Sequence, residues 1–233
     1  MNDAKMKISH NIGSLNEKSL HSQIKDWYAR KSDHLEVKVD SYVIDIIRDN
    51  LLIEIQTGNF SSIRDKLHNL TQNNRLRLVY PSSQLKWIVK LDKSRQNEIS
   101  RRKSPKKGKL VNIFDELVRI PDLFPEKNLE IEVLLIESED IRSDDGLGSW
   151  RRKGVSLIDN RLIRVIESVV FSNPEDFLMF IPDNVEKPFT NKSLSKASGI
   201  NIDQVRKMTY CLRKMNAIQQ VGKDGNALLF DIL

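Results

Sequence analysis

Residues 42–57 read YVIDIIRDNLLIEIQT, and this stretch decides the fold that we expect for the chain. Two runs of β-forming residues flank Asp49-Asn50, a pair that suits a two-residue hairpin turn. A turn centred there makes the numbers of opposed residues sum to 99, so that Asp45 faces Glu54. Side chains alternate along a strand, which puts both carboxylates and Gln56 on one face of the sheet. The opposite face, which we expect to be packed, carries Ile44, Ile46, Ile53 and Ile55.

Two carboxylates that face each other on an apolar hairpin repel one another, and burial increases the repulsion. A divalent cation between Asp45 and Glu54 would remove this conflict. Mg²⁺ (or Mn²⁺) suits the site, because Mg²⁺ prefers oxygen ligands and often takes only one or two carboxylates. An ion held there can activate a water and neutralise charge on a phosphate. Two other interpretations stay open: the pair shares one proton, or a shifted register keeps the two side chains apart.

The segments around the hairpin predict alternating helices and strands. Ser14 and Glu17 fit a capping box that opens a helix ending near Ala29, after a loose tail over residues 1–13. Apolar spacing predicts a helix over Ser61–Leu70. The other predicted elements are strands over 75–81, 85–91, 129–137 and 155–166, the last with an optional hairpin turn at 159–160, and helices over 111–120 and 173–180.

This order of elements resembles the core of the PD-(D/E)xK (restriction-endonuclease-like) nucleases. A helix with Glu17 precedes a strand with Asp45, a strand with Glu54-Ile55-Gln56, a helix and a further strand. The resemblance implies an α/β fold with a mixed β-sheet flanked by helices. It also implies that Asp45 and Glu54 bind the metal, that the Ile55 carbonyl faces it, and that Glu17 is an extra metal or water ligand. A capping glutamate needs no further role, so that alternative stays open for Glu17.

Gln56 departs from the family pattern, in which a lysine at this place is thought to orient or deprotonate the attacking water. Glutamine can hydrogen-bond that water, but it carries no charge and is no base. Some members of the family have glutamine here, and others supply a lysine from the following helix, where Arg64 or Lys66 could serve. The resemblance therefore implies phosphodiester hydrolysis by a catalytic set of Glu17, Asp45, Glu54 and Gln56.

Basic charge is concentrated in two parts of a chain whose net charge is +6. Residues 93–109 hold eight Lys/Arg against one Glu, and residues 188–233 hold seven against three Asp. This distribution favours a polyanionic partner, and we expect DNA, with RNA as an open alternative. The stretch 93–109 lacks apolar periodicity, which predicts a long exposed loop, solvated if it has no partner. Its candidate nucleic-acid ligands are Arg101, Arg102, Lys103, Lys106 and Lys107.

Residues 188–233 predict a small second domain after a nuclease-like domain over 14–185. A helix over 190–198 ending at Gly199, a second helix to about Met215 and a hairpin around 222–225 resemble a winged helix-turn-helix. An apolar stripe of Val205, Met208, Leu212 and Met215 should face the core. A winged helix can also contact a protein, which is the alternative. The DNA contacts that the resemblance implies are Gln204, Arg206, Lys207, Tyr210, Arg213 and Lys214, with Lys223 at the wing tip.

Three hypotheses about function follow. The first is an Mg²⁺-dependent endonuclease acting on DNA, which the family resemblance allows to be a homodimer. The second is a DNA-binding regulator with an inactive nuclease fold, and the third is a subunit of a nucleic-acid-processing or defence complex. The chain has no apolar run long enough to span a membrane and no apolar signal core, so we expect a cytoplasmic protein. Its single cysteine, Cys211, fits that compartment.

Overall fold

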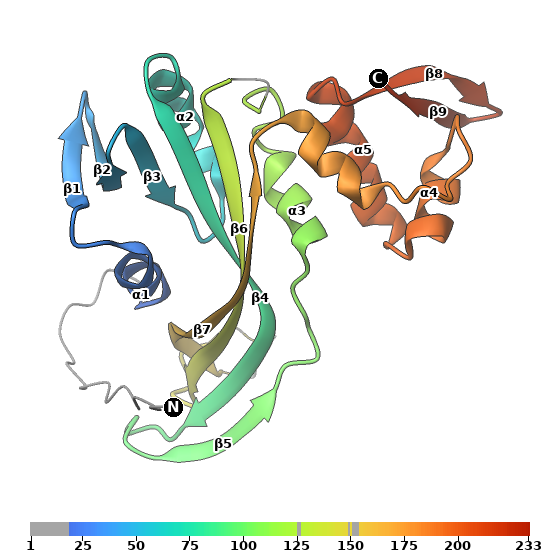
Figure 1. The fold of residues 1–233 in the computed structure, drawn as a ribbon. Coiled ribbons are helices and arrows are strands. Elements are labelled where there is room, and N and C mark those ends of the chain that lie inside the picture. Colours follow the sequence, from blue (N-terminus) through green and yellow to red (C-terminus); the bar gives the residue numbers. More distant parts are fainter. Residues whose placement is uncertain (1–18, 125–126, 149, 151–153) are drawn as a thin grey trace, which may run out of the picture.

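A mixed seven-stranded sheet forms the centre of the computed structural model, which describes residues 19–124, 127–148, 150 and 154–233 (Figure 1). The strand order is β1-β2-β3-β4-β6-β7, and β5 pairs with β4. The pairs β3–β4 and β4–β6 are parallel, and the other pairs are antiparallel. The strands are β1 (His34–Val39), β2 (Tyr42–Arg48), β3 (Leu51–Ile55), β4 (Arg75–Leu91), β5 (Glu98–Lys103), β6 (Leu129–Ser143) and β7 (Ser156–Phe171).

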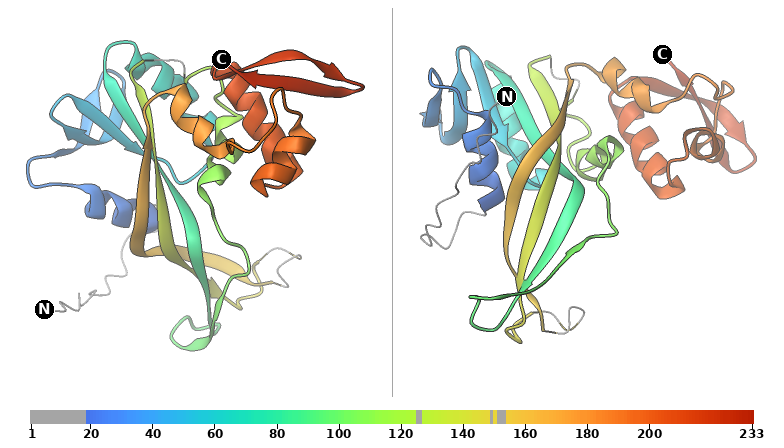
Figure 2. Two further views of the ribbon diagram at one scale, coloured as in Figure 1. Left: turned by 45° about the vertical axis from the view of Figure 1, so that its right-hand side comes forward. Right: turned by 60° about the horizontal axis from the view of Figure 1, so that its bottom comes forward.

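Helices cover both faces of this sheet, so the expected α/β class with a mixed sheet flanked by helices is confirmed (Figure 2). Helix α1 (Ser19–Tyr28) packs Leu20 and Ile24 onto one face. The opposite face carries α2 (Arg64–Thr71) and α3 (Phe114–Leu117), which follow the 3₁₀ helices η1 (Phe60–Ile63) and η2 (Leu110–Ile113). No helix in the described ranges has both the length and the apolar character needed to cross a membrane.

The β2–β3 hairpin has the predicted register. Ile46 pairs with Ile53 and Arg48 with Leu51, so the paired numbers sum to 99. Ile46, Ile53 and Ile55 pack together beneath α1, as the alternation predicts. The paired residues end at Ile46–Ile53, so Asp45 and Glu54 lie one residue beyond the last pair of this hairpin.

One part of the hairpin prediction is wrong: Ile44 does not share a face with Ile46. It packs with Leu52 on the opposite face of the sheet. The physical reason lies in the neighbouring strand, where Glu36 has a φ of 54°. Glu36 lies between the pairs Leu35–Ile46 and Val37–Ile44, so the left-handed residue interrupts the regular alternation at this point.

Strand β4 is one continuous strand of 17 residues, whereas the sequence predicts two strands over 75–81 and 85–91. The polar residues between them stay in the ladder, because a bulge between Ser83 and Leu85 keeps β4 paired with β6 on both sides. Strand β7 likewise shows no hairpin turn at Asp159-Asn160. Both residues pair with β6, and Asn160 Nδ2 also donates to Asp140 Oδ1 at 3.2 Å.

The prediction of a long loop over residues 93–109 is wrong, because β5 lies within it and pairs with β4. Every residue of β5 is exposed, which explains why the sequence shows no apolar periodicity there. Ladder hydrogen bonds and cation–π contacts hold the strand instead of burial. The Arg101 guanidinium and the Lys103 ammonium lie 5.0 and 5.2 Å from the centre of the Trp87 ring.

The C-terminal helices and hairpin form where the sequence predicts them. Thr190 caps α4 (Asn191–Ser198), which ends at Gly199 with a φ of 67°, and Asn201 caps α5 (Ile202–Lys214). The antiparallel strands β8 (Ile218–Asp224) and β9 (Ala227–Ile232) follow. The 3₁₀ helix η4 (Pro174–Phe180) leads into this part, whose buried residues join the core cluster beneath α3.

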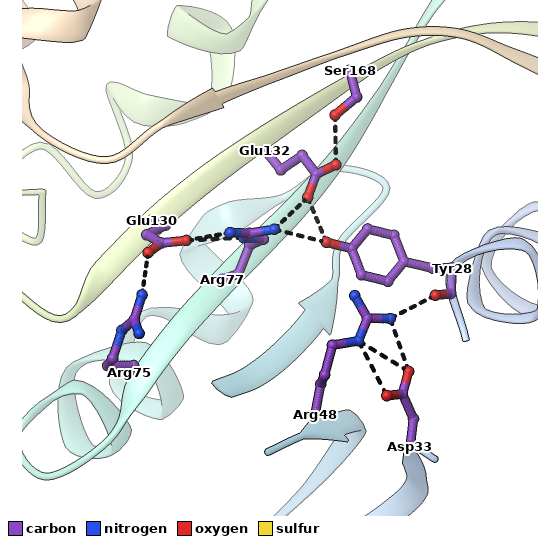
Figure 3. Close-up of polar contacts among 8 residues, drawn as sticks. All are labelled: Tyr28, Asp33, Arg48, Arg75, Arg77, Glu130, Glu132 and Ser168. Carbon is purple, nitrogen blue, oxygen red and sulfur yellow. Dashed lines mark hydrogen bonds and ion pairs between the residues drawn. The ribbon is translucent and has the colours of Figure 1, made fainter. Parts of the chain in front are cut away.

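A polar network fixes the end of α1 to the sheet (Figure 3). Tyr28 Oη donates to Glu132 Oε2 at 2.5 Å and accepts from Arg77 Nη1 at 3.2 Å. Arg77 also forms two hydrogen bonds with Glu130 Oε2, at 2.7 and 2.9 Å. Because these groups lie on α1, β4 and β6, the network sets the position of the helix that approaches the carboxylate pair.

Candidate metal centre

The carboxylate pair lies where β2 and β3 stop pairing. Beyond the Ile46–Ile53 pair, the Asp45 side chain takes the place of a ladder acceptor, because its Oδ2 accepts a hydrogen bond from the Ile55 amide at 2.8 Å. From α1, His21 Nε2 donates to the same oxygen at 3.2 Å. Sequence reasoning missed His21, although its position beside Leu20 on an amphipathic helix places it close to the packed face.

Lys66 brings a positive charge to the site. From α2, its Nζ donates to Glu54 Oε1 at 2.5 Å and to the Val43 carbonyl at 2.7 Å. The side chains of Lys66 and Glu54 are 15% and 9% exposed, so this ion pair is screened less than a surface pair. Of the two basic residues that the sequence offers on this helix, Lys66 reaches the site, whereas Arg64 pairs with Asp122 at 3.7 Å.

The two carboxylates differ in acidity. Burial raises the pKa of Glu54, the charge of Asp45 raises it further, and the ion pair with Lys66 only partly opposes them. Burial also disfavours ionised Asp45, but hydrogen bonds from His21 and the Ile55 amide outweigh burial, so the pKa of Asp45 lies below its ordinary value. The pair therefore holds one readily ionised carboxylate beside one that resists ionisation.

One oxygen of the pair lacks a hydrogen bond. Glu54 Oε2 is buried and accepts no hydrogen bond of normal geometry in the described part of the chain, although the nearby Asp45 amide helps to lower the pKa of Glu54. A buried carboxylate oxygen without a donor is unfavourable unless a proton or a cation satisfies it. This orphaned oxygen and the neighbouring Asp45 fit a divalent cation that takes hard oxygen ligands.

The protein supplies only a partial ligand set. Within the described ranges, no group of three or more His, Cys, Asp or Glu residues is arranged to bind a metal. Two carboxylates are still enough for Mg²⁺, which keeps several waters and completes its shell with substrate phosphate. Glu17, the third carboxylate that the sequence proposes, and its cap partner Ser14 lie outside the described residues.

Gln56 takes part in the loop after β3. Its Nε2 donates to the Gly58 carbonyl at 2.5 Å and lies 3.4 Å from the Asn59 carbonyl. These contacts bind the amide to the turn before η1, and the backbone amide of Gln56 donates to the Val79 carbonyl at 2.9 Å. The side chain thus stabilises the turn, a contact that the sequence pattern does not predict.

The basic candidates of residues 93–109 are exposed and occupy two kinds of position. Arg101, Arg102 and Lys103 lie on β5, and Arg101 Nη1 also pairs with Glu139 at 2.7 Å. Lys106 and Lys107 lie on the segment that follows β5 and crosses back toward η2. The structure therefore presents these charges on an ordered strand and its return segment.

Helix α5 uses part of its polar face to pack against the η2–α3 segment. Gln204 Nε2 donates to the Val111 carbonyl at 2.8 Å, and Lys207 Nζ pairs with Asp115 at 2.5 Å. Lys214 lies 3.8 Å from Asp122. Two of the remaining candidates have partners within the C-terminal part: Arg206 pairs with Asp203, and Arg213 is hydrogen-bonded to Gln220. The other two are exposed: Tyr210, at 39%, and Lys223 on β8.

The stripe of α5 is buried as predicted, with Val205, Met208, Leu212 and Met215 in the core. Cys211 is buried beside it, and burial raises the pKa of its thiol to about 12. A thiol of such low acidity carries almost no thiolate at neutral pH, so Cys211 is no nucleophile.

Comparison with known proteins gives one family and one relative. The model of the family described as "Domain of unknown function (DUF8091)" matches residues 18–172. An uncharacterized protein of Treponema pallidum (strain Nichols) is 31% identical over 163 residues, which cover 70% of this chain. The matched region spans 64% of that relative's length. No solved structure matches the chain.

Proposed function

The chain belongs to the DUF8091 family, and from the geometry of its carboxylate site we propose that it is a metal-dependent endonuclease that hydrolyses DNA phosphodiester bonds. Asp45 and Glu54 would hold Mg²⁺ or Mn²⁺, with the Ile55 carbonyl and Glu17 as further ligands. The ion, when bound, supplies an activated water and neutralises phosphate charge. A winged-helix C-terminal module would add affinity for DNA.

The element order supports this proposal. Helix α1, strands β2 and β3, helix α2 and strand β4 follow one another in the order of the restriction-endonuclease-like core described above, with β1 as an additional strand between α1 and β2. In that order the two acidic residues come from adjacent strands and the cation comes from the next helix. Three different elements thus converge on one place, although Asp45 and Lys66 are 21 positions apart in the sequence.

The contact between Lys66 and Glu54 carries the proposal. In the resembled family a lysine near the second acidic ligand assists the attacking water, and Gln56 stands in its usual place here. The Nζ of Lys66, 2.5 Å from Glu54 Oε1, provides the missing positive charge from α2. A charged donor there can orient a water and stabilise charge that develops on a phosphate oxygen.

The other residues of the site have supporting tasks in this proposal. His21 and the Ile55 amide keep Asp45 ionised and fix its Oδ2, so the other oxygen, Oδ1, can bind a ligand. Burial around Glu54 removes water and strengthens electrostatic interactions. Gln56 holds the turn after β3 and so positions the Ile55 carbonyl beside it.

A second candidate function is a DNA-binding regulator with an inactive nuclease fold. It is favoured by the hydrogen bond that the Gln56 side chain donates to the Gly58 carbonyl. This contact leaves no catalytic group at the position of the family's lysine. A subunit of a larger nucleic-acid-processing assembly is a variant of this alternative. Metal-dependent cleavage separates the nuclease from both.

The test is a cleavage assay with plasmid, linear duplex and single-stranded DNA in Mg²⁺, Mn²⁺ or EDTA. We expect cleavage that needs metal and that Asp45→Ala abolishes. Asp65→Asn is the matched control, because Asp65 is an exposed carboxylate on α2 beside Lys66. Cleavage that survives Asp45→Ala, or no cleavage of any substrate, would contradict the proposal; DNA binding without cleavage would favour the regulator.

A further inference from the structure

The sheet has a gap beside the carboxylate site. One edge of β4 pairs with β6 along nearly its whole length, so β3 and β5 share the other edge. Strand β3 pairs with residues 75–79 and β5 with residues 87–91, which leaves the edge between them without a neighbouring strand. This gap begins where β3 ends, next to the segment that carries Glu54 and Ile55.

A cavity of about 500 Å³ occupies this gap. Leu20 of α1 and Thr57, which follows β3, also line the cavity and are the chain neighbours of His21 and Gln56. Its volume lies within the usual range for sites that enclose a small molecule. The polar lining comes chiefly from β4, β6 and β7 and includes Ser82, Ser83, Lys86, Asp140, Arg142 and Asn160.

The segment after β5, residues 104–109, forms a strap along the cavity and lines it with Ser104, Lys106 and Gly108. The Ser104 amide donates to the Lys86 carbonyl at 2.8 Å, and the Gly108 amide donates to the Ser83 carbonyl at 2.7 Å. A Cβ at Gly108 would lie 2.5 Å from Ser82 Oγ and 2.8 Å from the Ser83 carbonyl oxygen. The strap can therefore lie this close to β4 only because residue 108 is glycine.

The floor of the cavity holds preorganised polar groups. Asp140, which is 6% exposed, accepts from Arg142 Nη2 at 2.9 Å and from Asn160 Nδ2 at 3.2 Å, and pairs with Lys86 at 3.3 Å. Arg142 Nε and Asn160 Oδ1 are buried and have no partner among the described residues. One donor and one acceptor are thus held in place with unused hydrogen-bonding capacity.

The charges of the cavity favour an anion. Lys86 and Arg142 are already paired with Asp140, so the strap residue Lys106 is the lining cation for which no ion pair is seen among the described residues. Asp115 is already paired with Lys207 of α5, at 2.5 Å. The lining also contains one aromatic residue, Tyr80, whose ring packs in a T-shaped contact with Phe60 and is of the kind that contacts bases.

We propose that this cavity binds a single unpaired nucleotide of a nucleic-acid strand, with its phosphate near Lys86 and Lys106 and its base toward Tyr80. The inference rests on the proposed function and specifies its substrate, because two lining residues, Leu20 and Thr57, lie on the chain segments that carry the candidate metal site. A space of about 500 Å³ accepts one nucleotide but cannot enclose a duplex, so the strand must be single or have one nucleotide extruded.

The experiment is an NMR titration of the full chain in EDTA with thymidine 5′-monophosphate and, separately, with inorganic phosphate. Lys106→Ala and Lys107→Ala form a matched pair, because the two lysines are adjacent and exposed but only Lys106 lines the cavity. We expect the nucleotide to bind and Lys106→Ala to weaken it about tenfold, as loss of a charged hydrogen bond does. Lys107→Ala should leave the Kd within about twofold.

Three outcomes would overturn the inference: no binding of the nucleotide, phosphate binding as tight as nucleotide binding, or equal weakening by both variants. A blunt duplex that displaces the nucleotide as well as a single strand does would also contradict it. Asp45→Ala separates the two proposals, because we expect it to bind the nucleotide normally without cleaving DNA. Cleavage without nucleotide binding would overturn this inference alone, and nucleotide binding without cleavage would overturn the proposed function alone.

Discussion

Mg²⁺ should raise the thermal stability of this chain through the carboxylate pair. Glu54 Oε2 is buried without a hydrogen bond of normal geometry among the described residues, and the nearby charge of Asp45 disfavours ionised Glu54. A cation bound to the folded chain and not to the unfolded chain stabilises the former by RT ln(1 + [L]/Kd). At a free concentration about ten times the Kd, this is about 1.4 kcal/mol, which raises the Tm of a chain of this size by about 3–6 °C.

The assay is a thermal melt at fixed ionic strength, with and without Mg²⁺, for the wild type and Glu54→Gln. We expect Glu54→Gln to lose the Mg²⁺-dependent increase, because the amide is a far poorer ligand than the carboxylate. Asp65→Asn should retain the increase. An increase of equal size in wild type and Glu54→Gln would show that Mg²⁺ acts elsewhere, and this reasoning would be refuted.

Without metal, the stabilities of the wild type and Glu54→Gln should differ in their dependence on pH. The raised pKa of Glu54 means that folding favours its protonated form. This contribution to stability is complete below the ordinary pKa of glutamate, and it is lost as the pH rises through the raised value. Glutamine does not titrate, so the stability of Glu54→Gln relative to the wild type should increase as the pH rises from about 4 to 7. A stability difference between the two proteins that does not change with pH would contradict a raised pKa of Glu54.

Three further predictions concern Lys66, the strap over residues 104–109 and the β8–β9 hairpin. Lys66→Met should lower the cleavage rate by about 100-fold or more, as loss of an electrostatic donor does, and an unchanged rate would exclude a catalytic role. Gly108→Ala should lower the free energy of unfolding by about 1–3 kcal/mol in a denaturant titration, because the new Cβ would meet the backbone of Ser83 and the side chain of Ser82. Gly222→Ala is the control: its Cβ would lie 3.8 Å from the nearest atom, so it should cost about 1 kcal/mol or less. Lys223→Ala should reduce the salt dependence of DNA binding by about one phosphate contact, whereas Lys207→Ala, which pairs with Asp115, should change it less.

The hairpin shows what local sequence determines. Turn chemistry at Asp49-Asn50 and the alternation of isoleucines were enough to predict the register of β2 and β3. They could not predict that Ile44 packs on the other face, because that depends on the left-handed Glu36 in the adjacent strand. The register is a local property, whereas the side-chain direction also depends on the neighbouring strand.

Non-local contacts explain the other differences. Strand β5 is fully exposed, so its sequence carries no burial pattern, and only pairing with β4 makes it a strand. The choice of Lys66 over Arg64 depends on the rotation of α2 about its axis. Packing of Gln204 and Lys207 against Val111 and Asp115 depends on how two distant parts of the chain meet, which helical periodicity cannot predict.

The central claim is that Asp45, Glu54 and Lys66 form a metal-dependent hydrolytic site. Its most direct test is the initial rate of plasmid nicking in Mg²⁺ by the wild type and by Glu54→Gln, which preserves the shape of the side chain. We predict measurable nicking by the wild type, none in EDTA, and a rate at least about 100-fold lower for Glu54→Gln. Equal rates for the two proteins, or a wild type that does not nick DNA in any metal, would contradict the claim.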